Sequence, residues 1–158
     1  MNNNYQKEFV VLYILYPNLT NPTEVLYLKK NPKQKAPKII WDKLVGFGGE
    51  IEVEDRINED YIRNATKREI KEELGIRIDK KIPMIYCGKI YRKSQNRIIH
   101  FLKIAFDKKL PQKYIENEGE CKYYDINYHL KNPNQFPPKD PQILSKIFFT
   151  DLTFNENL

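Results

Sequence analysis

The sequence is organised around the stretch from Gly46 to Ile76, in which a glycine-rich turn precedes a helix with three glutamates. Glu69, Glu72 and Glu73 are three and four residues apart, and these offsets place side chains on one face of a helix. Because carboxylates on one face repel each other, the pattern indicates a cation between them. Such hard oxygen ligands suit Mg²⁺ or Mn²⁺. A solvated helix face is the alternative, and the spacing alone weighs the two about evenly.

The two ends of this helix are marked in the sequence. Asn58 or Asp60 can cap its start, and Gly75 stands where a helix C-terminus favours a positive φ. Residues that can pack on a sheet recur every four positions, namely Ile62, Thr66, Ile70 and Leu74. The glutamates lie beside this stripe, so we expect them at the edge of the core, facing a cleft.

The segment from GFGGEIE to REIKEELGI resembles the Nudix box, in which Gly, five residues, Glu and seven residues precede Arg-Glu-aliphatic-x-Glu-Glu-x-Gly-aliphatic. The second half matches at every defined position. The first half fits with five inserted residues, because counting forward from Gly49 reaches Asp55 and counting back from Arg68 reaches Asp60. In the family a glutamate at this position orients the arginine. The partner of Arg68 is therefore open between the two aspartates.

The resemblance implies a fold and an arrangement of the chain. It covers roughly residues 8 to 150, and we expect one Nudix hydrolase domain over residues 1–158. The expected fold is α/β, the Nudix α/β/α sandwich, with a mixed curved sheet between helices and the catalytic helix in the Nudix box.

The resemblance also implies the catalytic residues. In the family the helix glutamates bind metal, and one of them or a glutamate on a later loop takes a proton from the attacking water. Glu73 is the safest metal ligand, Glu69 is a candidate base or ligand, and Glu72 completes the metal set. Arg68 is expected to hold the glutamates in place.

Residues around the glycine turn are expected to meet substrate and metal. The stretch from Trp41 to the turn resembles that of MutT-like enzymes, with three extra residues after the tryptophan. Gly48 and Gly49 let the backbone come close to a phosphate and a metal, and the carbonyl at the Gly49 position is a metal ligand in the family. A lysine on the preceding strand reaches the substrate pocket there, and Lys29 is the nearest match. The basic loop at residues 29–35 is either a solvated loop or a rim beside the active site.

Two later segments extend the resemblance. An acidic residue on the loop before CKYYD reaches back to the metal site in the family; Glu120 is the leading candidate, followed by Glu118 and Glu116. In the segment FPPKDPQIL, Asp140 stands where an Asn or Asp hydrogen-bonds an oxidised guanine in MutT-like enzymes. Asp140 can instead be simply the N-cap of a second helix that continues through Pro141.

The remaining elements follow from hydrophobic patterning. β-favouring runs predict strands at residues 9–16, 25–28, 84–91 and 98–106, with the first two and the last two joined as hairpins. Residues 107–118 are polar and predict a loop. The tail at residues 155–158 is expected to fray.

Composition limits partners and compartment. The net charge of +6 favours polyanions such as nucleoside phosphates or RNA, although no basic block reaches five residues. Cys87 and Cys121 have no metal-ligand spacing and form no disulfide framework. The N-terminus lacks a signal pattern, and no apolar run is long enough to span a membrane. These features predict a cytoplasmic protein with reduced thiols.

The resemblance therefore predicts a Mg²⁺-dependent pyrophosphohydrolase of nucleoside triphosphates that releases monophosphate and pyrophosphate. The glycine turn and the segment around Asp140 point to oxidised purine nucleotides such as 8-oxo-dGTP. The alternative is a Nudix hydrolase of a dinucleoside polyphosphate, a nucleotide sugar or the 5′ end of RNA. A binding module without catalysis is disfavoured because all three helix glutamates are present.

Overall fold

The computed structural model describes residues 6–33 and 36–158. The N-terminal residues 1–5, on which the expected lack of a signal pattern partly rests, and residues 34–35 of the basic loop lie outside this description. In chain order the elements are β1 (Lys7–Tyr16), β2 (Glu24–Lys30), η1 (Lys38–Ile40), β3 (Leu44–Val45), β4 (Phe47–Glu50), η2 (Val53–Asp55), α1 (Tyr61–Leu74), β5 (Ile85–Arg92), η3 (Lys93–Gln95), β6 (Arg97–Ala105), β7 (Lys113–Ile115), β8 (Gly119–Asp125), α2 (Tyr128–Lys131), η4 (Pro133–Gln135), α3 (Asp140–Phe149) and β9 (Phe154–Asn157). Among the described helices, none has the length and apolar character needed to cross a membrane.

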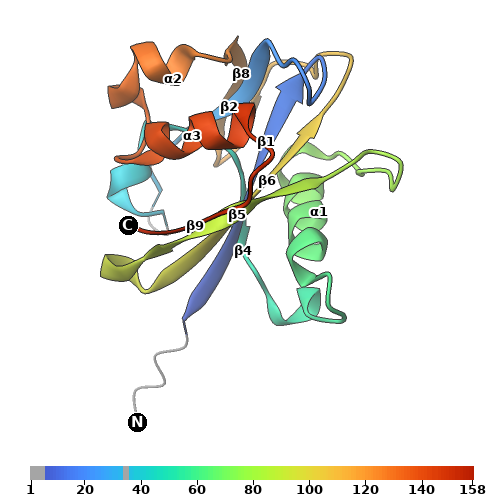
Figure 1. Cartoon of the computed structure of the whole chain (residues 1–158), viewed down its shortest axis with the longest axis vertical. Coiled ribbons are helices and arrows are strands. Elements are labelled where there is room, and N and C mark those ends of the chain that lie inside the picture. Colours follow the sequence, from blue (N-terminus) through green and yellow to red (C-terminus); the bar gives the residue numbers. More distant parts are fainter. Residues whose placement is uncertain (1–5, 34–35) are drawn as a thin grey trace.

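The described strands form one sheet in the order β7-β8-β2-β1-β6-β5-β9, with β3 added to β2 and β4 added to β1. The pairs β1–β6 and β5–β9 are parallel, whereas the other pairs are antiparallel. Helix α1 covers one side of the sheet, and α2 and α3 lie on the other side (Figure 1). The predicted α/β fold with a mixed sheet between helices is confirmed.

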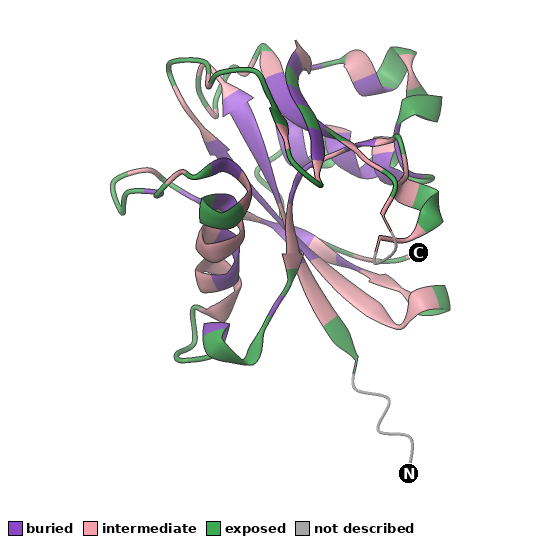
Figure 2. Cartoon of the chain, turned by 180° about the vertical axis from the view of Figure 1, so that it is seen from behind, coloured by how far each residue is buried: buried purple, intermediate pink, exposed green. Residues whose placement is uncertain are grey.

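Strand β1 is central and is buried on both faces beyond its first residues, and this explains its apolar sequence from Phe9 onward. Val10, Leu12 and Ile14 belong to the core on the α1 side. Tyr13 and Leu15 belong to the core under α3. Buried residues gather along the central strands between the two helical layers (Figure 2).

Helix α1 follows the sequence prediction closely. Thr66, Ile70 and Leu74 are buried against the sheet, and Gly75 ends the helix with φ 70° and ψ 18°. The start differs from the expected cap, since the side chain of Asp60 makes no capping hydrogen bond to the helix. The side chain of Asn58 instead accepts a hydrogen bond from the backbone N–H of Asp60, at 2.9 Å.

Two predictions for the chain after α1 are wrong. The segment expected as a loop at residues 107–118 contains the short strand β7, which pairs with β8. The tail is not frayed, because β9 adds to β5 as a parallel strand and Phe154 packs 6.0 Å from the ring of Phe101. Gly88 makes room for this strand: a Cβ there would lie 2.3 Å from the carbonyl oxygen of Phe154. The β7–β8 pair is a short hairpin, whereas the β5–β9 pair joins residues far apart in the sequence and has no local sequence signal.

Candidate active site

Arg68, near the middle of α1, is the centre of a polar network. Its Nε and Nη2 donate to the two carboxylate oxygens of Asp55, at 3.0 and 2.9 Å. Nη2 also donates to the carbonyl of Glu50 in β4, and Nη1 donates to Glu69 Oε1, both at 2.9 Å. The arginine thereby joins η2, β4 and α1.

Asp55, and not Asp60, is the partner of Arg68. The side chain of Asp55 is only 5% exposed, and its carboxylate also accepts the backbone N–H of Glu52 at 2.8 Å. Burial would raise the pKa of Asp55, but the hydrogen bonds and charge of Arg68 hold that pKa below its ordinary value. Asp60 pairs instead with Arg63 on the exposed side of the helix. The five inserted residues therefore lie after Asp55. Asp55 keeps the spacing from Gly49 that the resemblance predicted.

The structure brings two of the three helix glutamates to a pocket. Glu69 and Glu73 line it, whereas Glu72 has a side chain 58% exposed that contacts Arg68 from outside at 3.3 Å. Burial raises the pKa of Glu69, and the charge of Arg68 opposes this. Burial, with the nearby Glu118 carboxylate, raises the pKa of Glu73 to about 8. Glu73 Oε2 is buried without a hydrogen-bond partner among the described residues.

Glu118 is the glutamate of the later loop that reaches the pocket. It lies in the turn between β7 and β8, where its carboxylate is held between Lys30 and Lys33, the latter at 2.6 Å. Burial would raise the pKa of Glu118, but the two lysines outweigh this effect and lower it. Glu118 and both lysines line the same pocket as Glu73.

Glu120 and Lys29, the residues favoured from the sequence, are outside this pocket. They are opposite each other in the β2–β8 pair, and both are exposed. Side chains alternate between the two faces of a strand, so Lys30 faces the pocket where Lys29 faces away. The same alternation separates Glu120 from the pocket. Glu116, the third candidate, is also exposed and does not line it.

Gly49 lets β4 come close to α1, and Gly48 lets it come close to β1. A Cβ at Gly49 would lie 2.4 Å from Glu69 Oε1, so only glycine leaves room for that carboxylate. A Cβ at Gly48 would lie 1.9 Å from the backbone oxygen of Val10. The first clash involves the end of a flexible side chain, whereas the second involves rigid backbone.

We therefore expect different results from the two neighbouring substitutions. Gly48→Ala should lower the free energy of unfolding by about 2–3 kcal/mol, because the backbone of β1 must move. Gly49→Ala should retain near wild-type stability and displace Glu69. Thermal and urea denaturation of the two variants measures this difference. Equal losses of stability would show that Glu69 cannot move aside.

The carboxylates fit a hard divalent cation in their chemistry. Glu73 offers a buried oxygen without a partner among the described residues, and the Glu69 carboxylate packs directly against the backbone of Gly49. Oxygen donors of this kind suit Mg²⁺ or Mn²⁺. Within residues 6–33 and 36–158, no three His, Cys, Asp or Glu side chains are already gathered to hold a metal ion.

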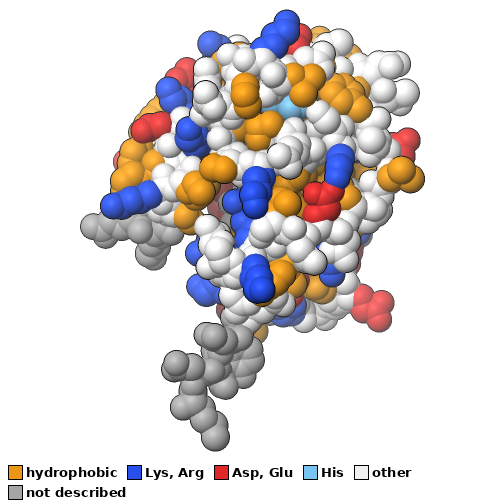
Figure 3. Space-filling view, turned by 60° about the vertical axis from the view of Figure 1, so that its left-hand side comes forward, with side chains coloured by type: hydrophobic (Ala, Val, Ile, Leu, Met, Phe, Trp, Pro, Cys, Tyr) orange, Lys and Arg blue, Asp and Glu red, His pale blue; other side chains and the backbone are white. Residues whose placement is uncertain are grey.

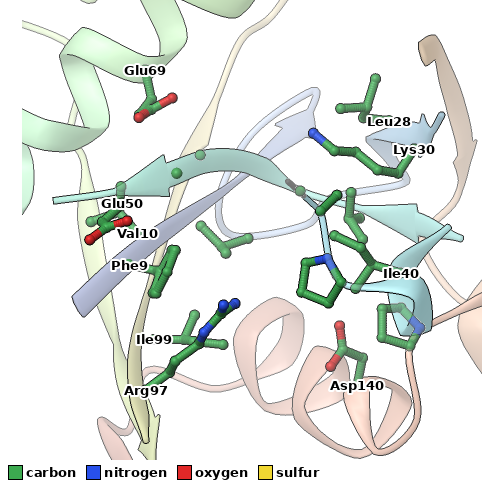
Figure 4. A pocket seen from close by; sticks show the side chains of 18 of the residues that line it. Phe9, Val10, Leu28, Lys30, Ile40, Glu50, Glu69, Arg97, Ile99 and Asp140 are labelled. Atoms are coloured by element: carbon green, nitrogen blue, oxygen red, sulfur yellow. The ribbon is translucent and has the colours of Figure 1, made fainter. Parts of the chain in front are cut away.

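The pocket extends from these carboxylates to the N-terminus of α3 and has a volume of about 620 Å³. In Figure 4, Glu69 and Lys30 lie above β4, while Asp140 points into the pocket from α3 below it. The walls between are largely apolar and include Phe9, Ile40 and Ile99. A pocket of this size, with charged groups at both ends, is suited to a nucleotide-sized ligand.

Asp140 does not cap α3. Lys139, with φ 71°, occupies the N-cap position, and no side-chain capping hydrogen bond is present there. The carboxylate of Asp140 instead accepts a hydrogen bond from Arg92 Nη2 at 2.7 Å. Burial raises the pKa of Asp140 to about 6 although the arginine opposes the shift. Arg92 was not identified from the sequence, because it is 48 residues away from Asp140.

Comparisons with known proteins identify the fold. No family model and no curated protein matches the sequence. Among solved structures, the chain is similar to a NUDIX hydrolase from Nitrosomonas europaea, with a TM-score of 0.65 and 17% identity over 97% of this chain and 78% of the other. It is also similar to a mutT/nudix family protein from Listeria innocua, with a TM-score of 0.60 and 17% identity over 90% and 91% of the two chains. A third similar structure is the E. coli dihydroneopterin triphosphate pyrophosphohydrolase, with a TM-score of 0.58 and 15% identity over 89% and 94%. The chain therefore has the Nudix fold, as the resemblance predicted.

Proposed function

We propose that this protein is a Nudix hydrolase that uses Mg²⁺ or Mn²⁺ to split nucleoside triphosphates into nucleoside monophosphate and pyrophosphate. The observation that carries the proposal is the unpartnered, buried carboxylate oxygen of Glu73, at the end of a nucleotide-sized pocket that also contains Glu69. A buried carboxylate without a partner costs free energy, so its retention favours a functional role. One neighbour of the same fold is named as a pyrophosphohydrolase of a triphosphate, which supports the same reaction type.

The two ends of the pocket suit the two ends of such a substrate. Lys30 and Lys33 lie beside Glu73 and attract the phosphates. Glu118 offsets one of their two positive charges, so phosphate oxygens would compete with its carboxylate for the lysines. Apolar walls and the buried Asp140 at the other end suit a base. Oxidised purines such as 8-oxo-dGTP are the proposed substrates, with Asp140 hydrogen-bonding the base.

The reaction adds water across a phosphoanhydride bond. A divalent cation bound at these carboxylates would neutralise phosphate charge and orient the attacking water. The water oxygen attacks phosphorus, the bridging P–O bond breaks, and the proton of the water passes to a carboxylate. Of the carboxylates that line the pocket, Glu69, Glu73 and Glu118 are the proposed candidates for this base. Arg68 keeps Glu69 in place through its hydrogen bond.

An RNA 5′ end is the second candidate substrate, and a specific feature favours it. Lys7 and Arg97 extend the basic lining of the pocket beyond the lysines near Glu73. Lys and Arg side chains also gather near the middle of the face seen in Figure 3. A chain of phosphates leaving the pocket would be attracted to such charges.

A hydrolysis panel with Mg²⁺ tests the proposal. It compares 8-oxo-dGTP, dGTP, diadenosine polyphosphate, ADP-ribose and 5′-triphosphate RNA under one condition. A strong preference for 8-oxo-dGTP over dGTP is the expected result. Preference for RNA or the dinucleotide, with a steep loss of RNA binding as salt is added, would replace the mononucleotide proposal. No hydrolysis of any compound would contradict the enzyme assignment.

A further inference from the structure

A second polar network lies on the α1 side of the sheet. Glu8 is its centre: one carboxylate oxygen accepts a hydrogen bond from Arg56 Nη2 at 2.9 Å, and the other lies 2.7 Å from His100 Nε2. His100 Nδ1 lies 2.9 Å from the hydroxyl of Tyr86. All four residues lie outside the pocket. Neighbouring side chains of a strand point to opposite faces, so Phe9 lines the pocket whereas Glu8 faces the other way.

This network is mostly buried, and the side chains of Glu8 and His100 are 18% and 5% exposed. Burial would raise the pKa of Glu8, but the hydrogen bonds from His100 and Arg56 outweigh this effect and lower that pKa. Burial lowers the pKa of His100, although Glu8 opposes the shift. At neutral pH an ionised Glu8 therefore accepts from Nε2–H of a neutral His100, whose Nδ1 accepts from Tyr86. Because each of these buried polar atoms has a partner, Glu8 is a rigid anchor on the sheet.

Arg56 connects this anchor to the inserted segment. It is the first of the five inserted residues and directly follows Asp55, and its guanidinium lies over the ring of Tyr61, 4.6 Å from the centroid. Asn64 and Arg68, both on α1, bind Asp55 from the helix side. Arg56 binds the same turn to β1. The carboxylate that orients Arg68 is thereby held between helix and sheet.

We propose that Glu8 and Arg56 are positioning residues for the proposed active site. Glu8 fixes Arg56, and Arg56 fixes the turn that carries Asp55. Asp55 in turn fixes the guanidinium of Arg68, which donates to Glu69. The five inserted residues lengthen the loop before α1, and a longer loop has more conformational entropy to lose. The bond to Glu8 restrains that loop at its first inserted residue. This inference rests on the proposed function and adds a role for two residues outside the pocket.

Arg56→Met tests this role, because methionine keeps an apolar stem on Tyr61 and removes the hydrogen bond to Glu8. We expect kcat for nucleoside triphosphate hydrolysis with Mg²⁺ to fall by about 3- to 10-fold, since Arg56 is one contact further out than groups that hold a ligand directly. KM should change by less than about twofold, because substrate binding is not altered. Arg56→Lys, which keeps a charged donor, should recover part of kcat. Arg77→Met, at an exposed arginine after α1, makes the same change in net charge and should behave as wild type.

A double-mutant cycle shows whether Arg56 acts through Asp55. If it does, adding Arg56→Met to Asp55→Asn should lower kcat by less than about a further twofold, because the chain of contacts is already broken. A side chain that only stabilises the fold would act independently of Asp55. Losses of kcat that multiply in the double variant would therefore overturn the inference.

The solvent exchange rate of the Arg68 Nε–H, measured by NMR, reports the geometry without catalysis. In the wild-type protein this group donates to the buried carboxylate of Asp55 at 3.0 Å, so exchange should be slow. Exchange should be severalfold faster in Arg56→Met and in Glu8→Gln, and unchanged in Arg77→Met. Thermal denaturation shows whether each variant is folded. If Glu8→Gln is not, the test rests on Arg56→Met, which alters a side chain that is 43% exposed.

The two readouts separate this inference from the proposed function. Unchanged Arg68 exchange or an unchanged kcat in folded Arg56→Met would overturn the positioning role, even if the wild-type protein is an active hydrolase. Wild-type protein that hydrolyses no nucleotide, together with faster exchange in Arg56→Met, would contradict the proposed function and leave the positioning of Arg68 intact.

Discussion

Replacing Glu73 with glutamine is expected to lower kcat/KM for nucleoside triphosphate hydrolysis by about 10³-fold, a typical loss for a catalytic acid, base or charge-stabilising group. Glutamine retains the size of the side chain but removes the negative charge that a cation requires. The buried oxygen of Glu73 has no partner in the described structure, so no hydrogen bond is lost with the charge. Steady-state kinetics with Mg²⁺ measures the effect.

Two further measurements make this result specific. Mg²⁺ should raise the Tm of the wild-type protein and should have little effect on Glu73→Gln, because binding to the folded state stabilises it. Glu59→Gln, an exposed substitution just before α1, is the matched control and should behave as wild type in both assays. If Glu73→Gln retains most of the hydrolytic activity, the assigned site is wrong.

Replacing Asp55 with asparagine is expected to lower the free energy of unfolding by about 2–3 kcal/mol, since it removes the buried carboxylate that accepts two hydrogen bonds from the guanidinium of Arg68. Activity should fall as well, by about 10- to 100-fold, because residues that orient catalytic ligands have effects of this size. The reason is geometric: Arg68 joins Asp55 to Glu69 and to the backbone of Glu50. Urea denaturation and kinetics on the same protein measure the two losses.

Asp60→Asn is the matched control for this change. Its carboxylate is 56% exposed and pairs with Arg63 on the helix surface, so the loss should be below about 0.5 kcal/mol. The sequence left both aspartates as candidates for the partner of Arg68. A larger effect at Asp60 than at Asp55 would reverse the assignment made from the structure.

Local patterns predicted the central part of the fold. The apolar run at residues 9–16 and the spacing of Ile70 and Leu74 reflect contacts that each element makes with the sheet or core, so they are readable without the rest of the chain. The glutamate spacing predicted that Glu69, Glu72 and Glu73 would face one cleft; Glu69 and Glu73 line the pocket, whereas Glu72 is exposed outside it. Their roles as metal ligands stay a prediction, as does the role of Glu72.

The sequence was less informative about which side chains enter the pocket, because this depends on strand register and turn geometry. Lys30 and not Lys29 faces the pocket because of the phase of β2, and a one-residue shift would have exchanged them. Glu118 enters the pocket because of the turn that joins β7 and β8, where Asn117 adopts φ 63°. Neither detail is fixed by residue type alone.

Long-range contacts were not predicted at all. The pair of Arg92 and Asp140 joins the end of β5 to the start of α3, and helix-capping rules alone explained Asp140 from its local sequence. The pairing of β9 with β5 likewise has no local signal. Each depends on how distant elements pack together, which only the three-dimensional structure determines.

The products formed from a nucleoside triphosphate test the central claim most directly. ³¹P NMR of a reaction with Mg²⁺ and 8-oxo-dGTP distinguishes pyrophosphate from orthophosphate. The account predicts nucleoside monophosphate and pyrophosphate with the wild-type protein and neither product above background with Glu73→Gln. Release of orthophosphate and nucleoside diphosphate, or equal product formation by the two proteins, would contradict it.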